Sequence, residues 1–195
     1  MRAPLTNQEK QTLMRLAREA LLACVTGRRL PPLELKSVPE RLGSLGATFV
    51  TLTRRGALRG CIGALQAQIP LAEDVRQHAV AAALDDFRFP PVQPDELDQI
   101  EIEVSVLTEP EPLRYEGPED LIRRLSPGVD GVILTSGAHR ATFLPQVWEK
   151  VPDPELFLEM LCEKAGLPAG AWREGHLQVS TYQVESFHET EVHPT

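Results

Sequence analysis

The stretch that decides how the first half of the chain folds is LRGCIG, Leu58–Gly63. It closes the second of two runs, 47–52 and 57–62, whose composition favours strands. Between the runs, Gly56 supplies the positive φ that a tight hairpin turn demands. The sequence therefore predicts two antiparallel strands joined by a turn at residues 53–56.

Side chains alternate along a strand, so the hexapeptide is divided between two faces. The division places Leu58, Gly60 and Ile62 on one face and Arg59, Cys61 and Gly63 on the other. Residues two apart are separated by roughly 7 Å along a strand, within reach of a flexible guanidinium. Glycine weakens a strand unless another group must approach the backbone, so the two glycines beside Cys61 indicate a close contact.

Three further stretches accompany this one in the chain. They are AALDDFRFPP at 82–91, VSVLT at 104–108 and FLPQV at 143–147. Together with LRGCIG they resemble, in order and over most of the chain, the AMMECR1 domain family. The resemblance implies the family's fold, but the family has no established biochemical activity. It also implies two partners, because bacterial and archaeal members often accompany a Memo-like protein and a radical-SAM protein.

Composition limits the classes of function. The chain has 195 residues, of which 42% are hydrophobic and 25% charged, as in a soluble globular protein. A net charge of −8 argues against a general nucleic-acid binder, which needs a basic surface. Three cysteines without a CxxC motif favour a reducing cytosol, and we expect a cytoplasmic protein. No apolar run is long enough to cross a bilayer, so no membrane association is expected.

Regular elements follow from periodicity and capping signals. Thr6 and Glu9 form a capping-box pattern that begins a helix over 7–25. After the first hairpin, a helix is expected over 70–84 and a strand over 100–106. The prolines at 90, 91 and 94 are then expected to forbid a helix. The same order then recurs as a hairpin over 132–144, a helix after Asp153 and a strand from Leu177 onward.

The recurrence predicts two hairpin–helix–strand units, approximately 46–109 and 129–188. Hairpins produce antiparallel neighbours, so the expected fold is α+β, with two mainly antiparallel sheets and helices packed on them. Helix 7–25 is expected to pack on the body. The whole chain, 1–195, is interpreted as a single compact two-lobed domain of AMMECR1 type.

Cys61 and Arg59 are the candidate catalytic residues. In one interpretation, Arg59, assisted by Arg88, favours the thiolate form of Cys61, which attacks an electrophile or holds a cofactor covalently. In the other, Cys61 is a small residue in a tight strand between two glycines. Both interpretations remain open, and Cys24 and Cys162 are expected to be shielded on helices.

Candidate binding residues surround this pair. They are Gly60, Ile62 and Gly63 of the hexapeptide, Asp86 and Arg88 of the following loop, and Glu103 and Ser105 of a later strand. Arg88 and Arg59 together would suit an oxyanion. Alternatively, Asp86 and Arg88 only fix the loop to the sheet. Glu103 could act as a base beside Cys61, although glutamates on exposed strands are common.

Two classes of function remain. The first is an enzyme that acts on a small anionic molecule through a cleft around Cys61 and Arg59. The second is a binding or adaptor protein that uses the same groove for a peptide or protein partner. None of the five histidines forms a ligand-spaced pair, so no metal site is expected, and no cofactor can be named. The substrate, reaction and oligomeric state are not specified.

Overall fold

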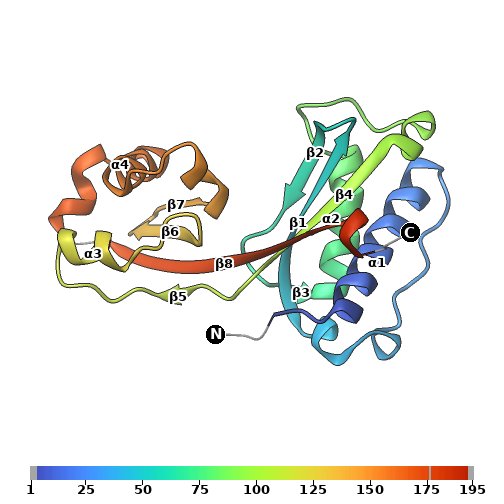
Figure 1. Ribbon diagram of the computed structural model, residues 1–195, viewed down its shortest axis with the longest axis horizontal. Coiled ribbons are helices and arrows are strands. Elements are labelled where there is room, and N and C mark those ends of the chain that lie inside the picture. Colours follow the sequence, from blue (N-terminus) through green and yellow to red (C-terminus); the bar gives the residue numbers. More distant parts are fainter. Residues whose placement is uncertain (1–3, 176, 193–195) are drawn as a thin grey trace. The chain divides into compact units, whose positions relative to one another are not determined.

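The computed structural model describes residues 4–175 and 177–192 of the chain. It divides into two compact units (Figure 1). Unit 1 contains Met1–Leu107 and Glu185–Thr195, and unit 2 contains Thr108–Val184. Each unit combines an antiparallel sheet with helices, which confirms the predicted α+β class.

The sheet of unit 1 is built on the predicted hairpin. Strand β1 (Leu45–Arg54) pairs on one side with β2 (Ala57–Gly63) and on the other with β4 (Ile100–Leu107). The turn between β1 and β2 has positive φ at Arg55 and Gly56, of 54° and 77°. The last residues of β8 (Gln178–His188) follow β4 in the strand order, and the two-residue β3 (Ile69–Pro70) pairs with the start of β1.

Two helices close one face of this sheet. Helix α1 (Asn7–Val25) begins with the predicted capping box of Thr6 and Glu9 and packs on α2 (Leu71–Leu84). Helix α2 packs in turn on β1 and β2, and a short α5 (Glu189–Val192) contacts α1. The core of unit 1 lies between these layers and includes the fully buried residues Leu13, Leu21, Val50, Leu52, Val75 and Ala79.

Unit 2 repeats the arrangement with its own core. Strands β6 (Asp130–Ser136) and β7 (His139–Phe143) form the second hairpin, and β6 pairs with the first part of β8. Strand β5 (Glu111–Pro112) pairs with β8, and helices α3 (Pro118–Arg124) and α4 (Pro154–Lys164) complete the unit. The α4 side chain of Phe157 stacks on Trp148 with 3.6 Å between ring centroids.

The predicted order of hairpin, helix and strand is thus present in each unit. Five 3₁₀ helices were not predicted: η1 (Leu35–Ser37), η2 (Glu40–Gly43), η3 (Pro94–Gln99), η4 (Pro145–Glu149) and η5 (Ala169–Glu174). Helix η3 begins at Pro94, so the expectation that this proline forbids a helix is wrong. Pro94 occupies the first helical position, where its missing N–H costs nothing and its fixed φ suits the helix.

Two expectations stay predictions. They are the residue limits of the two repeats and the interpretation of the whole chain as one two-lobed domain. Helix α1 belongs to unit 1. Within the described residues, no helix combines the length and apolar character needed to span a membrane.

Candidate functional site

Close packing explains why Gly60 and Gly63 of the hexapeptide are glycines. A Cβ atom on Gly60 would lie 2.1 Å from the carbonyl oxygen of Ala82 in α2. A Cβ on Gly63 would lie 2.3 Å from the ring of Phe49. Strand β2 therefore touches the α2 backbone on one face and an aromatic ring on the other, as the glycines indicated. Both glycines have a packing role.

The register of the hairpin changes the expected position of Arg59. Thr51 lies opposite Cys61 and Leu52 opposite Gly60, but Thr53 lies opposite Leu58. One residue of β2, Arg59, is thus left over in a bulge, which interrupts the alternation of faces. The prediction that Arg59 accompanies Cys61 on one face is wrong for this reason.

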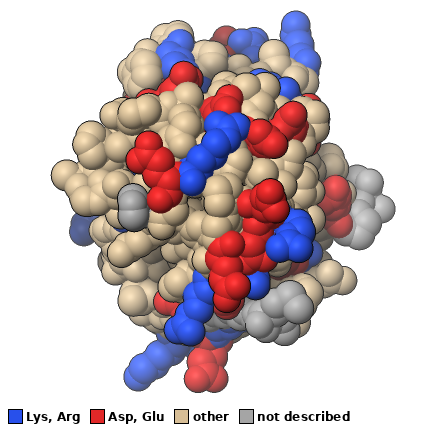
Figure 2. Space-filling view, turned by 90° about the vertical axis from the view of Figure 1, so that its left-hand side faces the viewer, with Lys and Arg blue, Asp and Glu red and all other residues tan. Residues whose placement is uncertain are grey.

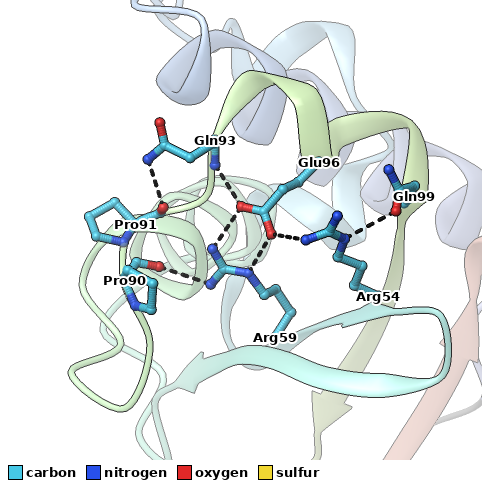
Figure 3. Close-up of polar contacts among 7 residues, drawn as sticks. All are labelled: Arg54, Arg59, Pro90, Pro91, Gln93, Glu96 and Gln99. Carbon is cyan, nitrogen blue, oxygen red and sulfur yellow. Dashed lines mark hydrogen bonds and ion pairs between the residues drawn. The ribbon is translucent and has the colours of Figure 1, made fainter.

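Arg59 instead binds the carboxylate of Glu96 in η3 (Figure 3). Its Nε and Nη2 atoms donate to the two carboxylate oxygens at 2.9 and 2.8 Å, and Nη1 donates to the Pro90 carbonyl at 2.9 Å. Arg54 of β1 donates to the same carboxylate at 2.9 Å, as does the backbone N–H of Gln93 at 2.8 Å. These hydrogen bonds, chiefly those from Arg59, lower the pKa of Glu96 from 4.5 to about 2. Glu96 therefore joins β1, β2 and η3.

Asp86 makes a second such junction. Its buried carboxylate accepts the backbone N–H of Cys61 at 2.8 Å and the side chain of Arg88 at 2.8 and 2.6 Å. The Arg88 hydrogen bonds hold the pKa of Asp86 well below its usual range. Arg88 also donates to the carbonyl of Cys61 at 3.2 Å. The geometry supports the interpretation in which Asp86 and Arg88 fix the loop to β2.

The contacts of Arg59 and Arg88 argue against the anion that the sequence predicts between them. Each guanidinium is held in a two-point contact by a carboxylate of its own, Glu96 or Asp86. An incoming anion would have to displace a charge-assisted pair at either arginine. Ile62 also leaves the candidate site, because it lies opposite Val50 and packs against the core of unit 1.

The open face of the unit 1 sheet holds the remaining candidates. Gly60 faces α2, so the alternate residues Cys61 and Thr51 lie on the face turned away from that helix. The Thr51 hydroxyl donates to the Cys61 sulfur at 3.3 Å. Thr51 lies opposite Glu103 of β4, whose carboxylate is 3.7 Å from Nε2 of His188 in β8. We call Cys61, Thr51, Glu103 and His188 the polar row.

Ser105 extends the polar row on β4. Its hydroxyl is 3.4 Å from a carboxylate oxygen of Glu103 and 2.8 Å from the hydroxyl of Ser186. Ser105 is buried, whereas Glu103 is partly exposed. The structure thus places Glu103 and Ser105 together, as predicted, and separates Glu103 from Cys61 by Thr51. A direct Glu103–Cys61 acid–base pair is not formed.

The three thiols differ in their surroundings. Cys24 is partly buried on α1 and Cys162 is fully buried on α4, and burial raises the pKa of both. Cys61 is partly exposed and accepts a hydroxyl hydrogen bond. Cys24 has the same intermediate exposure as Cys61, but its thiol donates to the Leu21 carbonyl at 3.2 Å, whereas the Cys61 sulfur accepts from a side-chain hydroxyl.

Sequence reasoning missed Thr51, Glu96 and His188. Thr51 lies opposite Cys61 only because the bulge at Arg59 shifts the hairpin register by one residue, so the sequence pattern could not reveal this pair. Glu96 had a signal, since Gln93, Pro94 and Glu96 have the spacing of a capping box that the structure forms. The position of His188 depends on a strand that begins in unit 2, and no local pattern reveals it.

No group of three or more histidine, cysteine, aspartate or glutamate side chains suited to a metal occurs within residues 4–175 and 177–192. The face drawn in Figure 2 carries acidic and basic side chains interspersed with one another. That mixture accords with a chain of 28 acidic and 20 basic residues.

Comparison with known proteins finds a matching family model, similar sequences and a similar solved structure. The AMMECR1 family model matches residues 14–187. The chain is 42% identical to a protein of Thermofilum pendens, over 95% of this chain and 92% of that protein. It is also 42% identical to a protein of Methanothermobacter thermautotrophicus, over 96% and 97% of the two chains. The crystal structure of uncharacterized protein PH0010 from Pyrococcus horikoshii matches with a TM-score of 0.78 and 39% identity, over 94% of this chain and 91% of that one.

Proposed function

The chain belongs to the AMMECR1 family, and we propose that it acts on a small electrophilic molecule through the Cys61 thiol. The observation that carries the proposal is the contact from the Thr51 hydroxyl to the Cys61 sulfur on the face turned away from α2. A partly exposed thiol with a fixed donor resembles a prepared nucleophile more than a packing residue. Cys24 is equally partly exposed but donates its thiol hydrogen to the Leu21 carbonyl, and Cys162 is buried.

The chemistry would be addition of the thiol to an electrophilic carbon such as a carbonyl. The sulfur–carbon bond forms, the carbonyl π bond breaks, and the thiol proton passes to the carbonyl oxygen. Glu103 and Ser105 would supply polar contacts to the rest of the molecule. Because Arg59 and Arg88 are each neutralised by a carboxylate, we favour a neutral or cationic molecule over the anion expected from the sequence.

Alkylation with iodoacetamide, read by peptide mapping over a pH series, tests the proposal. Cys61 should be labelled before Cys24 and Cys162 in the folded protein. Thr51→Val should slow the labelling of Cys61 at least severalfold, because it removes the hydroxyl donor and keeps the shape of the side chain. Thr53→Val, on the same strand and face, is the matched control and should change nothing. If Cys61 reacts only after unfolding, the proposal fails and Cys61 is structural.

A second candidate function is that of an adaptor, and the loop after α2 favours it. Phe87 is 95% exposed, although its neighbour Asp86 is anchored to β2. Leu58 of β2 is 44% exposed. Exposed aromatic side chains on a fixed loop are typical of protein contacts. By family association, the partner would be a Memo-like or radical-SAM protein in a shared cytoplasmic location.

The labelling assay also separates the two candidates. If this chain is an adaptor, a partner bound at the loop should slow the labelling of Cys61. The partner to add is the purified Memo-like or radical-SAM protein. Serum albumin at the same concentration is the control. Protection by one of these partners, with no adduct from a panel of small aldehydes, would favour the adaptor. A hemithioacetal on Cys61, detected without reduction as an aldehyde-sized mass increase of the intact protein by native mass spectrometry and absent from Cys61→Ser, would favour the enzyme.

A further inference from the structure

A groove in unit 1 lies between α1 and the segment that follows it. Its volume is about 610 Å³, within the size range of small-molecule sites. One wall is the face of α1 that carries Arg15, Leu16 and Leu22. The other is the chain over residues 28–34, and Arg76 of α2 also lines the groove. None of its lining residues belongs to the polar row.

The floor of this groove is apolar. Leu16 is 3% exposed and belongs to the core, whereas Leu22 is 41% exposed and points its side chain at solvent. Leu30 and Leu33 pack against the core from the extended segment. Exposed leucine beside a buried apolar floor offers a surface that a hydrocarbon body can cover.

The rim of the groove is positively charged. Four arginines and two glutamates line it, a surplus of two positive charges in a chain whose net charge is −8. Arg15 is paired with Glu19 at 2.7 Å, and Arg76 with Glu73 at 2.8 Å. The exposed side chains of Arg28 and Arg29, in contrast, make no hydrogen bond or ion pair with any described part of the chain. Two unengaged guanidinium groups therefore line a groove that has an apolar floor.

The extended wall is held in place without filling the groove. Pro31 and Pro32 restrict its backbone, and the carbonyl of Pro31 accepts a hydrogen bond from the buried Arg76. The N–H of Arg28 donates to the Ala23 carbonyl at 2.8 Å, which fixes where the segment leaves α1. The segment is thus held at Arg28 and at Pro31, and binding there would require little ordering of the backbone.

We propose that this groove binds a small amphipathic oxyanion. The apolar body would cover Leu16 and Leu22, and the head group, a carboxylate or phosphate monoester, would be held by Arg28 and Arg29. Guanidinium groups suit both heads, because their paired N–H donors match the oxygens of either group. The two unpaired guanidinium groups disfavour a cationic head, and the apolar floor favours a ligand with a hydrocarbon body over a simple inorganic anion.

The test is calorimetric titration of the full-length protein with octanoate and with octyl phosphate. Acetate, inorganic phosphate and the octyltrimethylammonium ion serve as probes that lack the body or reverse the charge. We expect binding of octanoate or octyl phosphate, at least tenfold tighter than acetate or inorganic phosphate, and none of the cation. The tighter of the two amphiphiles identifies the head group.

Variants assign the binding to this groove. Arg28→Gln with Arg29→Gln should weaken the amphiphile at least tenfold. Arg123→Gln with Arg124→Gln, which removes the same charge from α3 in unit 2, should leave the affinity unchanged. Leu22→Asn should also weaken it, and its exposed position keeps the fold intact. Equal binding of the cation, or an unchanged affinity in the Arg28 and Arg29 variant with retained circular dichroism, would overturn the proposal.

Discussion

At the scale of single residues, the side chain of Glu96 joins three elements, β1, β2 and η3. Glu96 is 6% exposed, and its carboxylate accepts from Arg54, Arg59 and the N–H of Gln93. Glu96→Gln would leave the largely buried Arg59 without its counter-charge. We expect a loss of about 3 kcal/mol in the free energy of unfolding at neutral pH. Urea unfolding followed by circular dichroism measures it, with the exposed Glu101→Gln of β4 as the control that should lose less than about 0.5 kcal/mol.

The same carboxylate makes stability depend on pH. Its pKa is lowered from 4.5 to about 2 on folding, so the unfolded chain takes up the proton first as the pH falls. The stability that Glu96 contributes is complete above pH 4.5 and is lost progressively toward pH 2. Glu96→Gln should therefore reduce the fall in stability between pH 5 and pH 3. An unaltered pH profile in the variant would show that the carboxylate is not the titrating group.

The roles of single residues were harder to predict from the sequence than the elements or the fold class. The sequence identified Cys61, Asp86 and Arg88 as a neighbourhood, and hydrogen bonds join all three. It assigned Arg59 to the wrong partner, because strict alternation cannot anticipate the extra residue of a bulge. A carboxylate that reaches Arg59 from 37 positions away has no local signature.

At the scale of elements, the contact of β2 with α2 is set by Gly60. A Cβ there would meet a backbone oxygen of α2 at 2.1 Å, and a backbone atom cannot rotate aside. Gly60→Ala should therefore force the strand and helix apart and cost about 1 to 3 kcal/mol. Gly43→Ala is the matched control, since nothing lies within 4 Å of its Cβ position. Thermal unfolding compares the two, and equal stability of both variants would refute the packing role of Gly60.

Elements were predicted well where a local rule governs them. The capping box of Thr6 and Glu9 begins α1 at the predicted residue, and Asp153 caps α4 by accepting the N–H groups of Glu155 and Leu156. The short helices were missed because packing and single prolines decide them. Helix η3 is an example, since Pro94 was interpreted as a breaker but begins the helix.

At the scale of the molecule, the repeat of hairpin, helix and strand corresponds to two separate apolar cores. The core of unit 1 contains Leu52 and that of unit 2 contains Leu134, each with no exposed surface. The sequence predicted the repeat of hairpin, helix and strand, whereas the two separate cores are a finding of the structure. The sequence could not predict that β8 begins in unit 2 and ends in unit 1, since a strand's partners are chosen by the fold.

Separate cores predict separate responses to core lesions. Leu52→Ala should destabilise unit 1 by about 2 to 5 kcal/mol, and Leu134→Ala should do the same to unit 2. Both tryptophans, Trp148 and Trp172, lie in unit 2, so their fluorescence reports that unit in the intact chain. Hydrogen exchange of the α1 amides, measured in the same urea series, reports unit 1. Leu52→Ala should lower the urea midpoint of α1 and spare that of the tryptophans, and Leu134→Ala should do the reverse. If either variant moves both midpoints equally, the two cores unfold as one cooperative body and the division is geometric only.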